Sequence, residues 1–253
     1  MIPHDERFVD LEGAHNFRDL GGLPTRDGAR TRSGVMFRSD ALHHLEPGDV
    51  EQLLELGMRY VIDLRSSVEL ERTGRGPLEA TDVGWLHAPL SHSEAGVQVL
   101  PPALVEGDLG RHYAESLAER TETLAQIVRH LATPDHLPAV FHCTAGKDRT
   151  GMVAALVLSL VGVDDTVIVE DYALTDDRMA LVIARIRESG DFPEQLAPAA
   201  ARIARAEASS METFLGAVTQ EYGDARGWAH SAGIGDDVIE SLHDLLVDGS
   251  PGG

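Results

Sequence analysis

The chain has 253 residues, 43% of them hydrophobic, which is enough for one large domain with a substantial core. The 42 acidic and 21 basic residues give a net charge of −21, which argues against nucleic acid or an anionic membrane as the main partner. An anionic substrate would therefore need a local cluster of positive charge, and the remaining acidity serves solubility.

The cysteine content and the apolar segments indicate the cellular compartment of the protein. Cys143 is the only cysteine, so no intramolecular disulfide forms, as in proteins of a reducing compartment. The N-terminus has no apolar segment of a signal peptide, and the longest apolar run, 152–163, is too short to span a bilayer. We expect a cytoplasmic protein with no integral membrane segment, and the oligomeric state is unknown from the sequence.

The N-terminal third predicts alternating strands and helices. Residues 15–40 alternate short apolar and charged runs around glycines, which predicts a twisted hairpin with its second arm at 35–39. Apolar residues at helical spacing predict a helix over 45–56. Apolar runs then predict strands over 60–64 and 85–88.

Each of these two strands is followed by a feature of the predicted site. Asp63 and Arg65 stand where an α/β sheet presents side chains to its ligand crevice. The alternative interpretation is a helix cap and surface charges, because Ser66 and Glu69 open a short helical pattern. Residues 89–109 contain three prolines and two glycines, which predicts a mobile loop near the mouth of the site.

The middle of the chain predicts a phosphate cradle. Apolar residues at helical spacing over 110–133 predict a helix with one apolar face. Residues 139–151 then run from an apolar strand through a loop bent at Gly146, and the apolar helical segment 152–163 follows. A loop that feeds a helix N-terminus directs unpaired backbone N–H groups into one small space. Such a space binds an oxyanion, most naturally a phosphate.

Cys143 lies at the floor of this predicted cradle. The positive potential there, together with Arg149 six residues later, favours its thiolate form, which is a nucleophile. A lone cysteine is usually a small buried apolar residue, but such a cysteine needs neither Gly146 nor an arginine at this spacing. A nucleotide-binding loop is excluded, because Asp148 follows Lys147 where that motif needs serine or threonine.

The C-terminal third predicts helices. Caps and apolar spacing indicate helices over 164–174, 176–187, 211–222 and 236–247. Proline breaks and weak apolar faces make 176–208 a candidate helical lid, and an ordinary helical cap on the core is the equal alternative. The tail 248–253 is expected to be disordered.

Three motifs carry a resemblance to a known family. They are Asn16-Phe17-Arg18-Asp19-Leu20-Gly21-Gly22, Asp63-Leu64-Arg65-Ser66 and His142-Cys143-Thr144-Ala145-Gly146-Lys147-Asp148-Arg149-Thr150-Gly151. Together they resemble the bacterial cysteine-dependent tyrosine phosphatase and phosphoinositide phosphatase family. The resemblance implies an α/β phosphatase fold in a single domain over 1–253, with a central, largely parallel sheet flanked by helices. It implies a phosphomonoesterase that works through a phosphocysteine intermediate, with no cofactor and no metal.

The resemblance also assigns roles. Cys143 is the nucleophile, Arg149 the phosphate clamp, and Thr150 directs its hydroxyl at the cysteine sulfur. The backbone amides of Thr144, Ala145, Gly146 and Lys147 bind the phosphate oxygens. The supporting residues that brace this loop are His142, Asp63, Arg65, Asn16, Arg18, Asp19 and Arg38.

The leaving oxygen needs a proton donor, and two aspartates are candidates. In the family resembled, the donor is the loop aspartate, here Asp148. In most tyrosine phosphatases it lies on a separate loop about thirty residues upstream, where Asp108 fits. We favour Asp148, because residues 106–110 lack the aromatic and proline neighbours typical of that loop.

The sequence leaves an alternative open for the substrate and another for the function. Lys147 adds a cation at the rim, as in phosphoinositide phosphatases, but a multiply phosphorylated headgroup needs several cations. Phosphotyrosine in proteins, with broader dual specificity, therefore comes first and phosphoinositides second. A phosphate-binding protein without turnover is disfavoured because nucleophile, clamp and acid are all present, and sulfur transfer or arsenate reduction would need further cysteines. Secretion without a signal peptide, as in some relatives, stays open.

Overall fold

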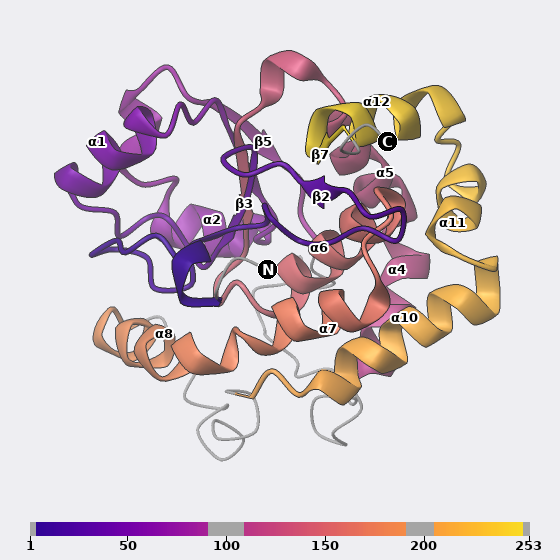
Figure 1. Cartoon of the computed structure of the whole chain (residues 1–253). Coiled ribbons are helices and arrows are strands. Elements are labelled where there is room, and N and C mark those ends of the chain that lie inside the picture. Colours follow the sequence, from indigo (N-terminus) through magenta and orange to yellow (C-terminus); the bar gives the residue numbers. More distant parts are fainter. Residues whose placement is uncertain (1–3, 91–108, 191–204, 250–253) are drawn as a thin grey trace.

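The protein is built around one mixed sheet, seen in a computed structural model that describes residues 4–90, 109–190 and 205–249 (Figure 1). Its five strands lie in the order β1-β3-β6-β4-β5. The strands are β1 (Arg18–Asp19), β3 (Met36–Ser39), β6 (Ala139–His142), β4 (Tyr60–Asp63) and β5 (Gly84–His87). All neighbours run parallel except β1, which is antiparallel to β3. The α/β fold with a largely parallel central sheet is therefore confirmed.

The strands are apolar on both faces, as parallel strands covered on two sides must be. Val61 of β4 and Val140 of β6 lie side by side and belong to one buried apolar cluster. Ile62 and Phe141, one residue further along the same two strands, belong to a second and larger cluster. Because successive side chains alternate between faces, these two clusters lie on opposite sides of the sheet.

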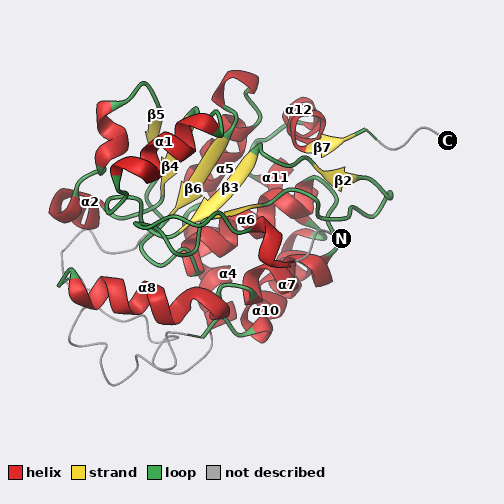
Figure 2. Cartoon of the chain, turned by 60° about the vertical axis from the view of Figure 1, so that its left-hand side comes forward, coloured by secondary structure: helices red, strands yellow, loops and turns green. Residues whose placement is uncertain are grey.

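The two faces are covered unequally (Figure 2). The smaller cluster packs under α1 (Pro47–Glu55) and the turn η2 (Pro77–Ala80). The larger cluster takes side chains from α4 (Leu109–Glu119), α5 (Thr121–Leu131), α6 (Asp148–Leu160), α7 (Asp165–Ala173), α10 (Ala208–Tyr222), α11 (Ala225–Ser231) and α12 (Asp236–Leu246). Helix α6 is buried along most of its length, so the helix that begins at the predicted cradle also lies at the centre of the core.

The remaining helical elements lie at the edges of these layers. Helix α2 (Ser67–Thr73) follows β4, and α8 (Asp176–Glu188) follows α7. The short 3-10 turns are η1 (His4–Arg7) and η3 (Pro134–His136). The predicted lid 176–208 thus includes α8, whereas its residues 191–204 lie outside the described residues, as do residues 91–108 of the predicted loop.

Most predicted elements are confirmed within a few residues, but the helical pattern over 110–133 is not one helix. It divides into α4 and α5 at Arg120, whose φ of −116° and ψ of 19° are not helical. The apolar spacing continues across this break, which no glycine or proline marks, so periodicity alone could not reveal it. Helix α11 was not predicted, because its seven residues are too few to establish a period.

The N-terminal hairpin is only partly as predicted. β1 and β3 do pair antiparallel, but the residues between them form β2 (Arg30–Thr31), which pairs instead with β7 (Val247–Asp248) near the C-terminus. The predicted disorder of 248–253 is therefore wrong at Asp248, which also binds Arg32 through its carboxylate at 3.1 Å. This pairing joins the two ends of the chain, which a local pattern cannot show.

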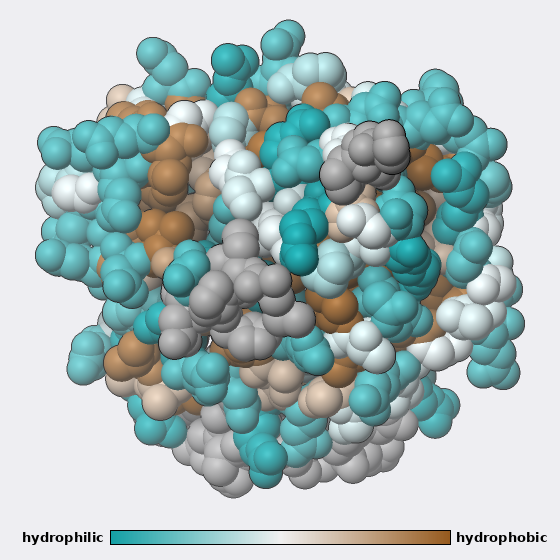
Figure 3. Space-filling view, viewed as in Figure 1, coloured by the Kyte–Doolittle hydropathy of each residue, from teal (hydrophilic) through white to brown (hydrophobic). Residues whose placement is uncertain are grey.

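One face of the molecule is largely polar. Figure 3 shows hydrophilic side chains over most of one face, with apolar residues in narrower strips between them. Within the described ranges, the structure contains no helix that combines the length and apolarity needed to cross a membrane.

Candidate active site

The loop between β6 and α6 forms a tight turn that only glycine allows at its bend. Gly146 has φ of +67°, and a Cβ atom there would lie 2.5 Å from the carbonyl oxygen of Ser39. Both the left-handed backbone and the close approach therefore exclude a side chain. The turn is followed directly by the first residues of α6, which begins at Asp148.

The loop carbonyls are held on the outside of this turn. Asn16 Nδ2 donates to the carbonyls of Ala145 and Gly146 at 3.3 and 3.2 Å, and Arg38 Nη2 donates to the Gly146 carbonyl at 2.9 Å. The Ala41 amide donates to the Thr144 carbonyl. In a trans peptide the N–H points opposite to the C=O. The amides of the residues that follow these carbonyls therefore point to the inside of the turn, as an anion cradle requires.

A buried ion cluster supports this arrangement from behind. Asp171 of α7 accepts from Arg38 at 2.7 Å, Arg18 at 3.2 Å and Arg7 at 2.8 Å. Arg18 also donates to the side chain of Asn16, the residue that binds the loop carbonyls. Burial alone would raise the pKa of Asp171, but the charges of its three arginine partners outweigh burial and lower the pKa far below its usual range.

Asp19 supports a different segment from the one predicted. Its carboxylate accepts from the amides of Gly21 and Gly34 at 2.8 and 2.7 Å. It therefore ties together the two ends of the β1–β3 connection and makes no hydrogen bond to the phosphate loop in the described part of the chain. Its neighbour Arg18 points the other way, toward Asn16 and Asp171, because adjacent strand residues point to opposite sides.

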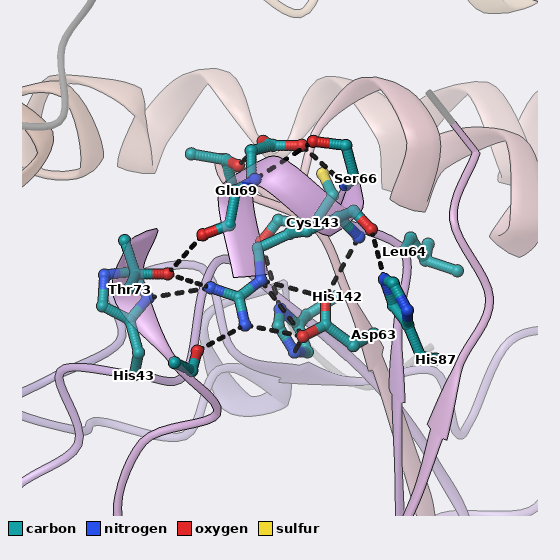
Figure 4. Close-up of polar contacts among 12 residues, drawn as sticks. His43, Asp63, Leu64, Ser66, Glu69, Thr73, His87, His142 and Cys143 are labelled. Atoms are coloured by element: carbon teal, nitrogen blue, oxygen red, sulfur yellow. Dashed lines mark hydrogen bonds and ion pairs between the residues drawn. The ribbon is translucent and has the colours of Figure 1, made fainter. Parts of the chain in front are cut away.

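Asp63 and Arg65 form a second buried pair, beside His142 (Figure 4). Arg65 holds Asp63 with both Nε and Nη2, and it also binds Thr73 and Gly74 at the end of α2. Burial would raise the pKa of Asp63, but His142 and Arg65 lower it to about 2. Both side chains are fully buried, which rules out the alternative of surface charges.

His142 orders the backbone at the nucleophile. Its Nδ1 lies 3.1 Å from the carbonyl oxygen of Cys143, and since a carbonyl only accepts, Nδ1 is the donor. Burial lowers the pKa of His142 in spite of the nearby Asp63 carboxylate. His142 therefore serves as a neutral hydrogen-bond donor to the start of the loop.

Glu69 is the site residue that the sequence did not reveal. It accepts from Arg149 Nη1 at 2.7 Å and from Nη2 at 2.9 Å, and it also accepts from the Thr144 hydroxyl. Glu69 was interpreted as part of a short helix, and its carboxylate does cap α2 through the Ser66 amide. The signal that could have found it is this capping box, which turns its carboxylate back toward the end of β4.

The guanidinium of Arg149 is thereby fixed at the mouth of the loop. Burial would lower the pKa of Arg149, but Glu69, Cys143 and Asp148 outweigh it and raise the pKa. The same contacts lower the pKa of Glu69, against the effect of burial. Both shifts favour the charged forms of Glu69 and Arg149.

Two loop side chains are placed differently from the sequence-based expectation. Lys147 is buried rather than at a solvated rim, and its Nζ donates to the carbonyl of Arg205 at 3.2 Å. That carbonyl belongs to the segment that leads into α10. The Thr150 hydroxyl is buried and, in the part of the chain that is described, has no hydrogen-bond partner, so the bond to Cys143 is not made here. Spacing places Thr150 on the helix, but its χ1 rotamer decides where the hydroxyl points.

Asp148 opens α6 with its side chain partly exposed. Its Oδ1 accepts from the Tyr113 hydroxyl at 2.5 Å and lies 3.5 Å from Lys147 Nζ. The other candidate acid, Asp108, lies outside the described residues. Tyr113 lies in the segment 110–133, which was predicted only as an apolar helical face, so its polar contact is a further feature that spacing did not show.

The described residues offer no metal site, since they contain no group of three or more His, Cys, Asp or Glu side chains suited to hold an ion. What the loop brings together is a cysteine, a fixed guanidinium and a set of inward amides. This arrangement can bind a phosphate dianion against a sulfur nucleophile.

Comparison with known proteins agrees with this chemistry. Residues 9–248 match the tyrosine phosphatase family. A Mycobacterium tuberculosis (strain ATCC 25618 / H37Rv) protein named triple specificity protein phosphatase PtpB is 30% identical over 275 residues, covering 94% of this chain and 98% of that protein. A Nostoc commune protein named tyrosine-protein phosphatase is 29% identical over 217 residues, covering 81% of this chain and 71% of that one. Among solved structures, the Siw14 catalytic core matches with a TM-score of 0.44 and 15% identity, over 82% of this chain and 87% of that chain.

Proposed function

The chain belongs to the tyrosine phosphatase family, and from this premise we propose that Cys143 and Arg149 hydrolyse phosphotyrosine in proteins through a phosphocysteine intermediate. The observation that carries the proposal is the loop itself. Three of its carbonyls are held outward by the side chains of Asn16 and Arg38 and by the Ala41 amide, while Glu69 fixes Arg149 at its mouth. The two apolar clusters on one sheet support a single phosphatase domain.

In the first half of the reaction, the phosphate dianion lies among the loop amides. Cys143 Sγ attacks phosphorus in line with the leaving oxygen, so the S–P bond forms as the P–O bond to the tyrosine breaks. The inward amides and Arg149 stabilise the equatorial oxygens, where charge is held in the transition state. Asp148 gives its proton to the departing phenolic oxygen.

In the second half, water attacks the phosphocysteine on the side that the leaving group vacated. Asp148, now a carboxylate, takes a proton from that water, the P–O bond forms and the P–S bond breaks. Inorganic phosphate leaves and Cys143 returns as a thiolate. Asp148 is suited to both steps because it follows Lys147 at the end of the loop and its side chain reaches solvent.

Phosphotyrosine is the first substrate class, and the family supports broader specificity at the same site. The relative named triple specificity protein phosphatase PtpB supports a substrate range broader than phosphotyrosine. The phosphoinositide alternative depends on Lys147 as an extra cation, yet its ammonium group is buried against the Arg205 carbonyl. We therefore place phosphoproteins ahead of lipids.

The nucleophile is tested with Cys143→Ser. We expect loss of hydrolysis of p-nitrophenyl phosphate and of phosphotyrosine peptides, with the fold retained. Rapid acid quench of the wild type during turnover of a labelled peptide should trap one phosphate on Cys143. A Cys143→Ser variant with wild-type rates would remove the proposed mechanism. A panel of phosphotyrosine, phosphoserine and phosphothreonine peptides beside phosphoinositide vesicles then ranks the substrates.

The acid is tested by comparing Asp148→Asn with Asp108→Asn. Phenyl phosphate has a poor leaving group and needs protonation, whereas p-nitrophenyl phosphate needs little. We expect Asp148→Asn to lower kcat/KM on phenyl phosphate by about 100-fold or more and to affect p-nitrophenyl phosphate far less. The exposed Asp135 supplies a control, because Asp135→Asn should change neither rate. A selective loss in Asp108→Asn instead would transfer the role to Asp108.

A further inference from the structure

Two buried phenols stand behind Asp148. Tyr113 of α4 and Tyr172 of α7 are each 1% exposed, and their hydroxyl oxygens lie 2.8 Å apart. A buried hydroxyl is costly unless it is hydrogen-bonded, so the contacts of these two groups define where each proton lies.

The direction of the hydrogen bonds follows from counting protons. A phenol has a single proton, and Tyr113 donates it to Asp148 Oδ1 at 2.5 Å. The contact between the two hydroxyls must then run from Tyr172 to the Tyr113 oxygen. Burial and the nearby Asp148 charge raise the pKa of both tyrosines, so both stay protonated and remain donors.

These contacts make the two oxygens of Asp148 unequal. In the described part of the chain, the hydrogen bond and the ion pair of this side chain both fall on Oδ1, from Tyr113 and from Lys147 at 3.5 Å. An oxygen that accepts from a phenol and faces an ammonium group is a poor place for a proton. Oδ2 is therefore the oxygen that carries the acidic proton.

The rings are held rigidly enough to fix this geometry. Tyr172 packs directly on α6, since a Cβ at Gly151 would lie 2.9 Å from its ring. Tyr113 meets the rings of Tyr172 and Phe214 edge to face, with centroids 6.3 Å apart in each case. The residue before Tyr172 is Asp171, which holds Arg38 and, through it, the loop carbonyl of Gly146.

We propose that Tyr113 is a positioning residue for the acid–base step, which it serves by holding Asp148 Oδ1 so that Oδ2 delivers and takes the proton, and that Tyr172 supports it through the shared hydrogen bond. This inference rests on the proposed role of Asp148. Neither tyrosine touches the phosphate in this scheme, so both act on catalysis only through that carboxylate.

Tyr113→Phe tests the proposal because it removes the hydroxyl and keeps the ring. Loss of a hydrogen bond to a charged group typically changes a rate or equilibrium constant by about 10- to 100-fold. We therefore expect kcat/KM on phenyl phosphate to fall by at least about 10-fold. The rate on p-nitrophenyl phosphate should fall by less than about 3-fold, because its leaving group needs little help. The alkaline limb of the pH profile on phenyl phosphate should move to higher pH, since the carboxylate form loses a donor.

Tyr172→Phe should show the same pattern at smaller size, because it acts one hydrogen bond further away. Tyr222→Phe is the matched control and should leave both substrates unchanged, since that partly exposed tyrosine lies at the end of α10. Thermal unfolding of each variant separates folding from catalysis, and the pH profile is measured only on the folded protein.

The decisive measurement is Tyr113→Phe in the Asp148→Asn background. If Tyr113 acts through Asp148, the double variant should be no slower than Asp148→Asn alone. Equal losses on both substrates, an unmoved pH limb, or a full further loss in the double variant would each overturn the proposal. If Asp148→Asn itself shows no preference for the poor leaving group, the acid assignment has failed instead, and the two failures are thus distinguishable.

Discussion

At the scale of single residues, the site depends on a carboxylate that holds an arginine. Glu69 binds both terminal nitrogens of Arg149 and the hydroxyl of Thr144, and its own position is fixed by the Ser66 amide. Without such a partner, a long arginine side chain must be ordered by the substrate at an entropic cost. Because Glu69 already orders the Arg149 side chain in the folded protein, the guanidinium is oriented before the phosphate binds.

Glu69→Gln should therefore lower kcat more than it raises KM, because an amide accepts at only one oxygen and cannot hold both arginine nitrogens. We expect a loss of about 10- to 100-fold in kcat on p-nitrophenyl phosphate, in line with the cost of misplacing a catalytic group. Glu71→Gln on the same helix is the control, since Glu71 is exposed. Similar losses in the two variants would show that the charge of α2, and not the Arg149 contact, is what matters.

At the scale of elements, the β6–loop–α6 unit is shaped by contacts with β3. The bend at Gly146 lies so close to the neighbouring strand that a Cβ there would fall 2.5 Å from the Ser39 carbonyl oxygen and 2.6 Å from the Asp40 amide nitrogen. Arg38 and Ala41 bind the loop carbonyls of Gly146 and Thr144. The loop therefore has little room to relax. Its amides are preorganised by the strand beside it, which lowers the cost of stabilising charge in the transition state.

Gly146→Ala should displace the loop and abolish most of the activity. The left-handed backbone alone costs about 1–2 kcal/mol for a residue with a Cβ. The Ser39 carbonyl, 2.5 Å from that Cβ, adds a steric conflict that only a backbone shift relieves. Gly162→Ala is the matched control at the other end of α6, because Gly162 also has positive φ but nothing within 4 Å of its Cβ position.

We expect Gly162→Ala to lose stability and keep kcat/KM, whereas Gly146→Ala should lose stability and at least about 100-fold in kcat/KM, as a displaced anion hole does. Thermal unfolding and turnover of p-nitrophenyl phosphate measure the two effects on the same samples. Full activity in Gly146→Ala would mean that the contact with β3 does not shape the cradle.

At the scale of the whole molecule, Asp171 joins segments far apart in the sequence. It binds Arg7 and Arg18 from the N-terminal segment and Arg38 from β3, and it belongs to α7 on the helical side of the core. The pairing of β2 with β7 adds a second tie between the two ends of the chain. Through Arg38, which binds the Gly146 carbonyl, Asp171 thus connects α7 and the N-terminal segment to the phosphate loop.

Asp171→Asn should destabilise the protein by about 3–5 kcal/mol, because it leaves buried arginine charges without their partner. Asp165→Asn, on the same helix, breaks only a half-exposed pair with Arg26 and should cost about 0–1 kcal/mol. Denaturant unfolding at neutral pH compares the two variants. Equal midpoints would contradict the central role of Asp171.

The same residue predicts a dependence of stability on pH. Because the pKa of Asp171 is lower in the folded chain than in the unfolded chain, the unfolded chain binds more protons in acid. The stabilisation is complete above the ordinary aspartate pKa of about 4 and is lost progressively as pH falls below it. The Asp171→Asn variant should start from a lower midpoint and lose less on acidification than the wild type.

The sequence by itself determined the features that depend on near neighbours. The strand, the loop and the helix around Cys143 follow from apolar runs, the bend at Gly146 and the spacing to Arg149. The motifs also selected Asn16, Asp63 and Arg65, the family resemblance added Arg38, and the alternation of strands and helices predicted the fold class. These features are local because backbone geometry and side-chain periodicity act over a few residues.

Tertiary structure alone decided the partners of these residues. Glu69 meets Arg149 across 80 positions and Tyr113 meets Asp148 across 35, and in each case helix packing brings the two side chains together. It also turned Lys147 into the protein and left the Thr150 hydroxyl without the bond to sulfur. Contacts of this kind depend on how layers pack and which rotamer fits, and no pattern along the chain encodes either.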